Sequence, residues 1–124
     1  NASYSGVISF AEAAINSINV WLRKAKSIDV PYFPDCPVGW NPSPRLQSRP
    51  EDLLLIVNRS ADQYGVFLQA AKRYISAFNV TPPLVFLSSW NEWTEGHYLL
   101  PDESYGSSYL EELRSVFESE STSP

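Results

Sequence analysis

The stretch PPLVFLSS at residues 82–89 decides the fold class of this chain. Its apolar run follows a Pro-Pro pair and ends at two serines, which is the pattern of a strand that is buried on both faces. Strands of that kind belong to parallel sheets that are covered by helices. The stretch therefore predicts a fully buried parallel strand over residues 84–89.

The seven residues that follow, WNEWTEG at 90–96, carry the chemistry. They place Glu92 and Glu95 three positions apart, next to the indoles of Trp90 and Trp93. In α/β folds the carboxyl end of a strand is where ligands bind and catalytic side chains collect. Two acids beside flat aromatic rings suit glycoside chemistry. The alternative is the solvated first turn of a helix, where acids favour the positive end of the dipole.

The rest of the chain alternates helices with short apolar runs. Capping boxes at Ser9–Glu12 and Ser60–Gln63 begin amphipathic helices over about 10–27 and 61–78, and a third helix is expected over about 107–118. The proline-interrupted stretch 30–38 is a strand candidate, and 39–50 reads as a loop. Residues 119–124 read as a disordered tail. Alternation of this kind predicts a parallel sheet with covering helices.

Composition limits the function classes. The 124 residues suffice for one domain, and a net charge of −5 with scattered basic residues argues against nucleic acid. No run is long enough to span a membrane. Cys36 is the only cysteine and His97 the only histidine, so neither a disulfide nor a zinc site is expected. A glycine-rich phosphate loop is absent, and we expect no cofactor.

The segment from Phe86 to Tyr109 closely resembles the C-terminal signature of the glycoside hydrolase family 99-like proteins. That group includes the endo-α-mannosidases and the bacterial WbsX-like glycosyltransferases of polysaccharide loci. The resemblance rests on WNEWTEG, LPD at 100–102, YG at 105–106 and YL at 109–110. It extends loosely to GWNPSPR at 39–45 and to NRS at 58–60.

The resemblance implies a (β/α)₈ TIM barrel, which typically needs about 250 residues. Residues 1–118 would then form its C-terminal portion, incomplete as a lone chain, with the N-terminal part of the barrel as the missing partner. A self-contained small α/β domain is the alternative.

The resemblance also implies roles for the two acids. Glu92 matches the residue that acts as base on the sugar 2-hydroxyl, and Glu95 matches the general acid that later becomes general base. The implied activity is a retaining glycoside hydrolase acting on an oligo- or polysaccharide. Thr94 stands where the endo-mannosidases have histidine, so the sequence does not identify mannan as the substrate.

The other candidate site residues would bind the saccharide. Trp40, Asn41 and Arg45 follow the preceding strand, and they lie near the acids if the two strands are parallel neighbours. Arg45 could hold an anionic group of the sugar. The complete set of candidate substrate-binding residues is Trp40, Asn41, Arg45, Trp90, Asn91, Trp93, His97 and Tyr98. Glycosyl transfer, a non-catalytic carbohydrate-binding module and a purely structural fragment remain alternatives.

Overall fold

Side-chain caps set the starts of the two long helices. The γ-oxygen of Ser9 accepts a hydrogen bond from the backbone N–H of Glu12, and that of Ser60 accepts one from Gln63, both at 3.2 Å. Each cap satisfies a backbone donor that the first helical turn leaves unpaired. The computed structural model describes residues 6–46 and 53–118. Its α-helices are α1 (Phe10–Ser27), α2 (Ala61–Ala77) and α3 (Ser108–Glu118). The three predicted helices are thus confirmed.

The strands are short, and they pair two by two. They are β1 (Gly6–Ser9), β2 (Asp35–Pro37), β3 (Leu54–Val57), β4 (Phe86–Ser88), β5 (Asn91–Glu92) and β6 (His97–Tyr98). β1 pairs with β3 and β2 with β4, both in parallel, whereas β5 and β6 are antiparallel. The strand expected over 84–89 is β4, and the candidate at 30–38 contracts to β2. The four residues of β1 were not predicted.

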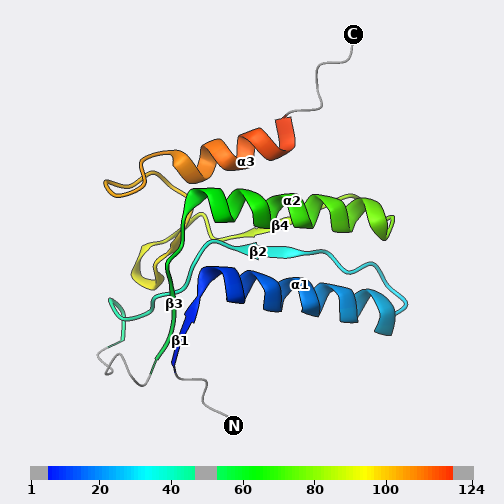
Figure 1. Ribbon diagram of the computed structural model, residues 1–124, viewed down its shortest axis with the longest axis horizontal. Helices are drawn as coiled ribbons and strands as arrows, with labels where there is room; N and C mark the ends of the chain where they lie inside the picture. Colours follow the sequence, from blue (N-terminus) through cyan, green and yellow to red (C-terminus); the bar gives the residue numbers. More distant parts are fainter. Residues whose placement is uncertain (1–5, 47–52, 119–124) are drawn as a thin grey trace.

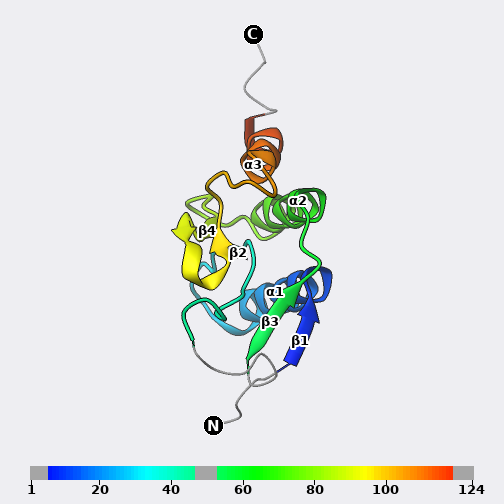
Figure 2. The same ribbon diagram turned by 90° about the vertical axis from the view of Figure 1, so that its left-hand side faces the viewer.

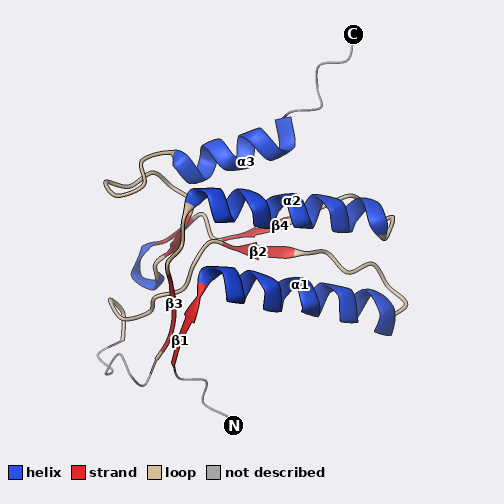
Figure 3. Cartoon of the chain, in the orientation of Figure 1, coloured by secondary structure: helices blue, strands red, loops and turns tan. Residues whose placement is uncertain are grey.

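The helices and the β2–β4 pair run side by side. Figure 1 shows β2 and β4 between α1 and α2, with α3 on the far side of α2. β1 and β3 cross the ends of these elements, as the red strands in Figure 3 show. Turned end-on, α1 and α2 lie to one side of the β2–β4 pair (Figure 2). The described residues therefore form a mixed α/β arrangement with helices against one face of the central pair.

Aromatic side chains fill the space between the helices and the strands. Trp21 of α1 stacks on Phe67 of α2, with ring centroids 5.3 Å apart and planes within 8°. The hydroxyl of Tyr64 donates a hydrogen bond to the backbone carbonyl of Cys36 at 3.2 Å, which ties α2 to β2. The buried cluster comprises Phe10, Trp21, Cys36, Val38, Tyr64, Phe67, Leu68, Ala71, Tyr74, Val80, Leu99, Tyr109 and Val116.

The prediction that the strand 84–89 is fully buried is wrong for the described chain. Leu84 is 47% exposed and Phe86 is 55% exposed, while Val85 packs against the core. The reason is geometric: side chains alternate across a strand, and the helices cover only one face of the β2–β4 pair. On the other face, the ring of Phe86 lies 6.0 Å from that of Phe33 and more than half of the residue stays exposed.

Some apolar positions on the helices also lie outside the core. The core stripe of α1 contains Phe10, Ala14, Ile18 and Trp21, which recur at helical spacing. Ile15 follows Ala14 on α1, projects away from this stripe and is 59% exposed. Phe117 follows the buried Val116 on α3 and is 40% exposed.

The core position of Phe67 gives a stability test with a neighbouring control. Replacing Phe67 by Ala should lower the free energy of unfolding by about 3–5 kcal/mol, because it leaves a cavity beside Trp21. Replacing Val66, which is 72% exposed, by Ala should change it by less than about 0.5 kcal/mol. Urea denaturation followed by tryptophan fluorescence measures both. Equal losses would show that the cluster described above is not the core in solution.

Candidate functional site

The loops that follow β2 and β4 meet at the same end of the strand pair. The parallel register places Asp35 opposite Phe86 and Pro37 opposite Ser88, so both strands end together. The backbone N–H of Val38 donates to the carbonyl of Ser88 at 2.8 Å and continues the pairing. The two strands are thus parallel neighbours, which was the condition stated for the approach of their loops. Segments 39–46 and 93–98 lie close together for that reason.

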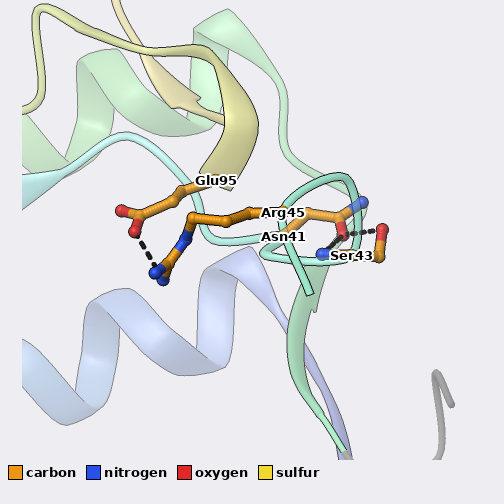
Figure 4. A network of polar contacts seen from close by, with 4 residues as sticks. All are labelled: Asn41, Ser43, Arg45 and Glu95. Atoms are coloured by element: carbon orange, nitrogen blue, oxygen red, sulfur yellow. Dashed lines mark hydrogen bonds and ion pairs between the residues drawn. The ribbon is translucent and has the colours of Figure 1, made fainter. Parts of the chain in front are cut away.

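An ion pair joins the two loops. A guanidinium nitrogen of Arg45 lies 2.8 Å from Oε1 of Glu95, and the Arg45 and Glu95 side chains are 49% and 19% exposed (Figure 4). Behind it, the backbone N–H of Asn41 donates to the carbonyl of Glu95 at 2.6 Å. The sequence suggested an anionic sugar as the partner of Arg45; in the structure its partner is a carboxylate of the protein itself.

A side-chain turn bends the loop that carries Arg45. The side-chain oxygen of Asn41 accepts hydrogen bonds from the hydroxyl of Ser43 at 2.6 Å and from its backbone N–H at 3.2 Å (Figure 4). The backbone N–H of Arg45 in turn donates to the carbonyl of Pro42 at 3.0 Å. Asparagine favours such local turns because its amide can replace a backbone acceptor. The turn brings Arg45 back toward Glu95.

Two glycines permit the loops to approach this closely. Gly96 ends the 3₁₀ helix η2 (Trp93–Glu95) with a φ of 54°, and a Cβ there would lie 3.0 Å from the Cβ of Asn41. A Cβ on Gly39 would lie 2.9 Å from the carbonyl oxygen of Gly96. The distance at Gly39 is shorter than Cβ contacts normally are, and at Gly96 a tight contact adds to a positive φ that other residues rarely adopt. The backbone at this junction therefore requires glycine on both loops.

His97 lies among the acids of the site. The antiparallel register puts it opposite Glu92, and residues in that relation project from the same face of a hairpin. The edge of Trp40 meets its ring at a centroid distance of 5.9 Å. Desolvation lowers the pKa of His97, although a hydrogen bond with the Ser88 backbone and the negative charges of Asp35, Glu95 and Glu92 act in the opposite direction. Desolvation therefore favours the neutral imidazole of His97 over the imidazolium.

The remaining predicted residues lie on the β5–β6 hairpin. Glu92 and Asn91 are exposed, and the indoles of Trp90 and Trp93 are 56% and 46% exposed. The ring of Trp93 lies 4.3 Å from that of Tyr98, at 36°. Flat apolar faces are thus open to solvent directly beside Glu92 and Glu95.

Asp35 and Arg59 lie near the site and were not predicted from the sequence. The hydroxyl of Ser88 donates to both carboxylate oxygens of Asp35 at 3.1 Å, which connects the ends of β2 and β4. The guanidinium of Arg59 lies against three tyrosine rings and donates to the carbonyl of Gly96 at 3.4 Å. The lone acid within an apolar strand candidate was a usable signal for Asp35. For Arg59, only the family-like NRS string indicated any importance.

Comparison with known families shows to which family the chain belongs. The family described as Glycosyltransferase WbsX matches residues 3–113, a span that contains every residue of the site. The chain belongs to this family. It is therefore a member of a carbohydrate-active group of proteins, as the resemblance implied. Comparisons with curated proteins and with solved structures found no match.

The described residues contain neither a candidate metal-binding cluster nor a helix that could span a membrane. Within residues 6–46 and 53–118, no group of three or more histidine, cysteine or acidic residues has an arrangement that could hold a metal ion. Across the same part of the WbsX family chain, no helix combines the length and apolar character that crossing a membrane requires.

The environment of His97 predicts its titration. Because desolvation disfavours the imidazolium, the single histidine should titrate with a midpoint below its usual value of 6.5. The Cε1 proton gives one NMR resonance that reports this midpoint directly. The lowered pKa means that the unfolded state binds the proton more tightly, so stability should fall as the pH drops below about 6.5. A midpoint above that of the urea-unfolded chain would contradict the burial described here.

Proposed function

We propose that Glu92 and Glu95 are the acid–base pair of a glycoside-active enzyme. The observation that carries the proposal is the meeting of two loops at the carboxyl ends of β2 and β4, where Arg45 pairs with Glu95. In α/β folds this end of the strands is where catalytic groups collect. The exposed indoles of Trp90 and Trp93 beside the acids suit a sugar ring.

The reaction proceeds in two steps. First, Glu92 takes the proton of the sugar 2-hydroxyl, whose oxygen attacks C1 while the bond from C1 to the leaving oxygen breaks. Glu95 gives its proton to that leaving oxygen, and a 1,2-anhydro sugar results. Glu95 then takes a proton from water, whose oxygen attacks C1 while the C1–O2 bond of the anhydro sugar breaks, and Glu92 returns its proton to O2. The configuration at C1 is retained because it is inverted twice.

Arg45 fits the second step of this sequence. Glu95 has to be a carboxylate to act as general base, and a carboxylate is the form that pairs with Arg45 at 2.8 Å. In the first step Glu95 has to hold a proton, so the bound sugar separates it from Arg45. The half-exposed side chain of Arg45 has the freedom to swing away.

The proposed fold is the C-terminal portion of a (β/α)₈ barrel, spanning residues 1–118. Two features support it: the parallel pairs that alternate with helices, and the face of β4 that carries the exposed Phe86. In a barrel, further strands would cover that face. The tail 119–124 lies outside the described residues. A self-contained α/β domain would have to leave this apolar surface in water.

Glycosyl transfer is the second candidate function. The family description itself favours it, since it names a glycosyltransferase. The same two acids would then serve an acceptor hydroxyl in place of water, and the leaving group would belong to an activated sugar donor. Product analysis separates the two: a hydrolase releases reducing sugar from a glycoside, whereas a transferase consumes a nucleotide sugar only when an acceptor is present.

Removing either carboxylate should abolish turnover. Glu92→Gln and Glu95→Gln keep the shape of each side chain but cannot exchange the proton, so we expect losses of about 10²–10⁴-fold in kcat. Glu103→Gln, which changes an exposed acid outside the site, is the matched control. Release of 4-nitrophenol from a panel of aryl glycosides measures the rates. A Gln variant with the rate of the control would remove that residue from the mechanism, and binding without turnover by the unaltered chain would favour a carbohydrate-binding module.

The role of the 2-hydroxyl separates this mechanism from direct nucleophilic attack by the protein. A 2-deoxy glycoside should bind nearly as well as its parent but should not turn over, because the attacking group is missing. Incubation with a 2-deoxy-2-fluoro aryl glycoside should leave the protein mass unchanged. A stable adduct on Glu92 or Glu95 in the intact mass spectrum would refute the anhydro-sugar route and support a glycosyl-enzyme intermediate.

A further inference from the structure

A pocket of about 590 Å³ adjoins the hairpin that carries the acids. We call it the Arg59 pocket; its lining includes Trp40, Asn41, Asn58, Arg59, Trp93 and Tyr98. Neither Glu92 nor Glu95 lines it, yet Trp93 stands between these acids in the sequence and forms part of its wall. Its volume falls within the range of about 300–1,000 Å³ that is typical of ligand sites.

Arg59 brings a positive charge to the pocket, and groups of the protein itself already stabilise that charge. Its guanidinium lies 4.9 Å from the ring centroid of Tyr98, 4.8 Å from that of Tyr105 and 5.4 Å from that of Tyr109. Stacking of this kind satisfies a cation without a ligand. Its Nη1 also donates to the carbonyl of Gly96. The cation therefore serves first to hold the hairpin against the end of β3.

Asp102 supplies the opposite charge. The hydroxyl of Tyr98 donates to one of its carboxylate oxygens at 2.6 Å, and the backbone N–H of Tyr105 donates to the other at 2.6 Å. Although desolvation acts in the opposite direction, these hydrogen bonds and the positive charge of Arg59 lower the pKa of Asp102. Arg59 and Asp102 thus form a neutral network with the tyrosines, which leaves little attraction for an anionic ligand.

The groups that remain for a ligand are aromatic faces and side-chain amides. Trp93 is 46% exposed, and Asn58 is an exposed residue with a φ of 57°. The backbone amide of Ile56 on β3 donates to the carbonyl of Trp40 at 2.9 Å, so the walls that carry Trp40 and Asn58 are fixed to each other. Indole faces cover the C–H face of a sugar ring, and amides both donate to and accept from its hydroxyls.

We propose that the Arg59 pocket is a subsite for one uncharged pyranose unit of the saccharide whose glycosidic bond lies at Glu92 and Glu95. The inference rests on the proposed function for its choice of ligand class. It goes further in placing a second sugar unit in a pocket that neither acid lines, with Trp93 shared between the two sites. Asn58 and Trp93 are the specificity-determining residues of this subsite.

Saturation-transfer NMR on the whole chain tests the proposal with methyl glucopyranoside, methyl galactopyranoside and methyl mannopyranoside, and with methyl glucuronide as the anionic comparison. At least one neutral glycoside should bind, and better than the glucuronide. Asn58→Gly should weaken binding by about threefold to tenfold, because it removes the amide while glycine accepts the positive φ. Trp93→Ala should weaken it by about tenfold or more, because the stacking face is lost.

Asn79→Gly is the matched control, since Asn79 is the other described asparagine with a positive φ (49°) and does not line the pocket. It should bind as the unaltered chain does. Equal binding by Asn58→Gly and Asn79→Gly, stronger binding of the glucuronide, or no binding of any neutral glycoside would each overturn the subsite. Glu92→Gln and Glu95→Gln should retain glycoside binding; if they also retain turnover, the proposed acid–base pair fails while the subsite stands.

Discussion

The parallel pairing of β2 with β4 is the constraint on which the site depends. Because both strands end together, the two loops that follow them leave from adjacent points and can touch. The hydrogen bond from Asn41 to the Glu95 carbonyl and the ion pair from Arg45 to the Glu95 side chain both follow from that arrangement. A shift in register by one residue would move these partners apart and turn the side chains of β4 to the other face.

Local sequence signals predicted the helices well. Ser9 with Glu12 and Ser60 with Gln63 specify helix starts through neighbouring backbone groups, so they act independently of the rest of the fold. The candidate cluster at 90–96 also stood out in the sequence, because its acids and indoles directly follow an apolar run and match the string of the family. The family match supports that reading of the chain as carbohydrate-active.

Features set by distant contacts escaped prediction. β1 is only four residues long, and it becomes a strand through pairing with β3, which no local pattern reveals. The partner of Arg45 was misjudged for the same reason, since its distance to Glu95 depends on two loops and a strand pair. Exposure of Phe86 could not be read from its hydrophobicity, because burial depends on which elements cover each face of β4.

The large sequence separation of the paired segments has a further consequence for how the molecule assembles. The hydrogen bonds between Asp35 and Ser88 join residues 53 positions apart, whereas each turn of α1 or α2 closes within four. Contacts of long sequence separation form late and cost more loop-closure entropy than local ones. The junction at Gly39 and Gly96 is therefore expected to form after the helices when the chain folds.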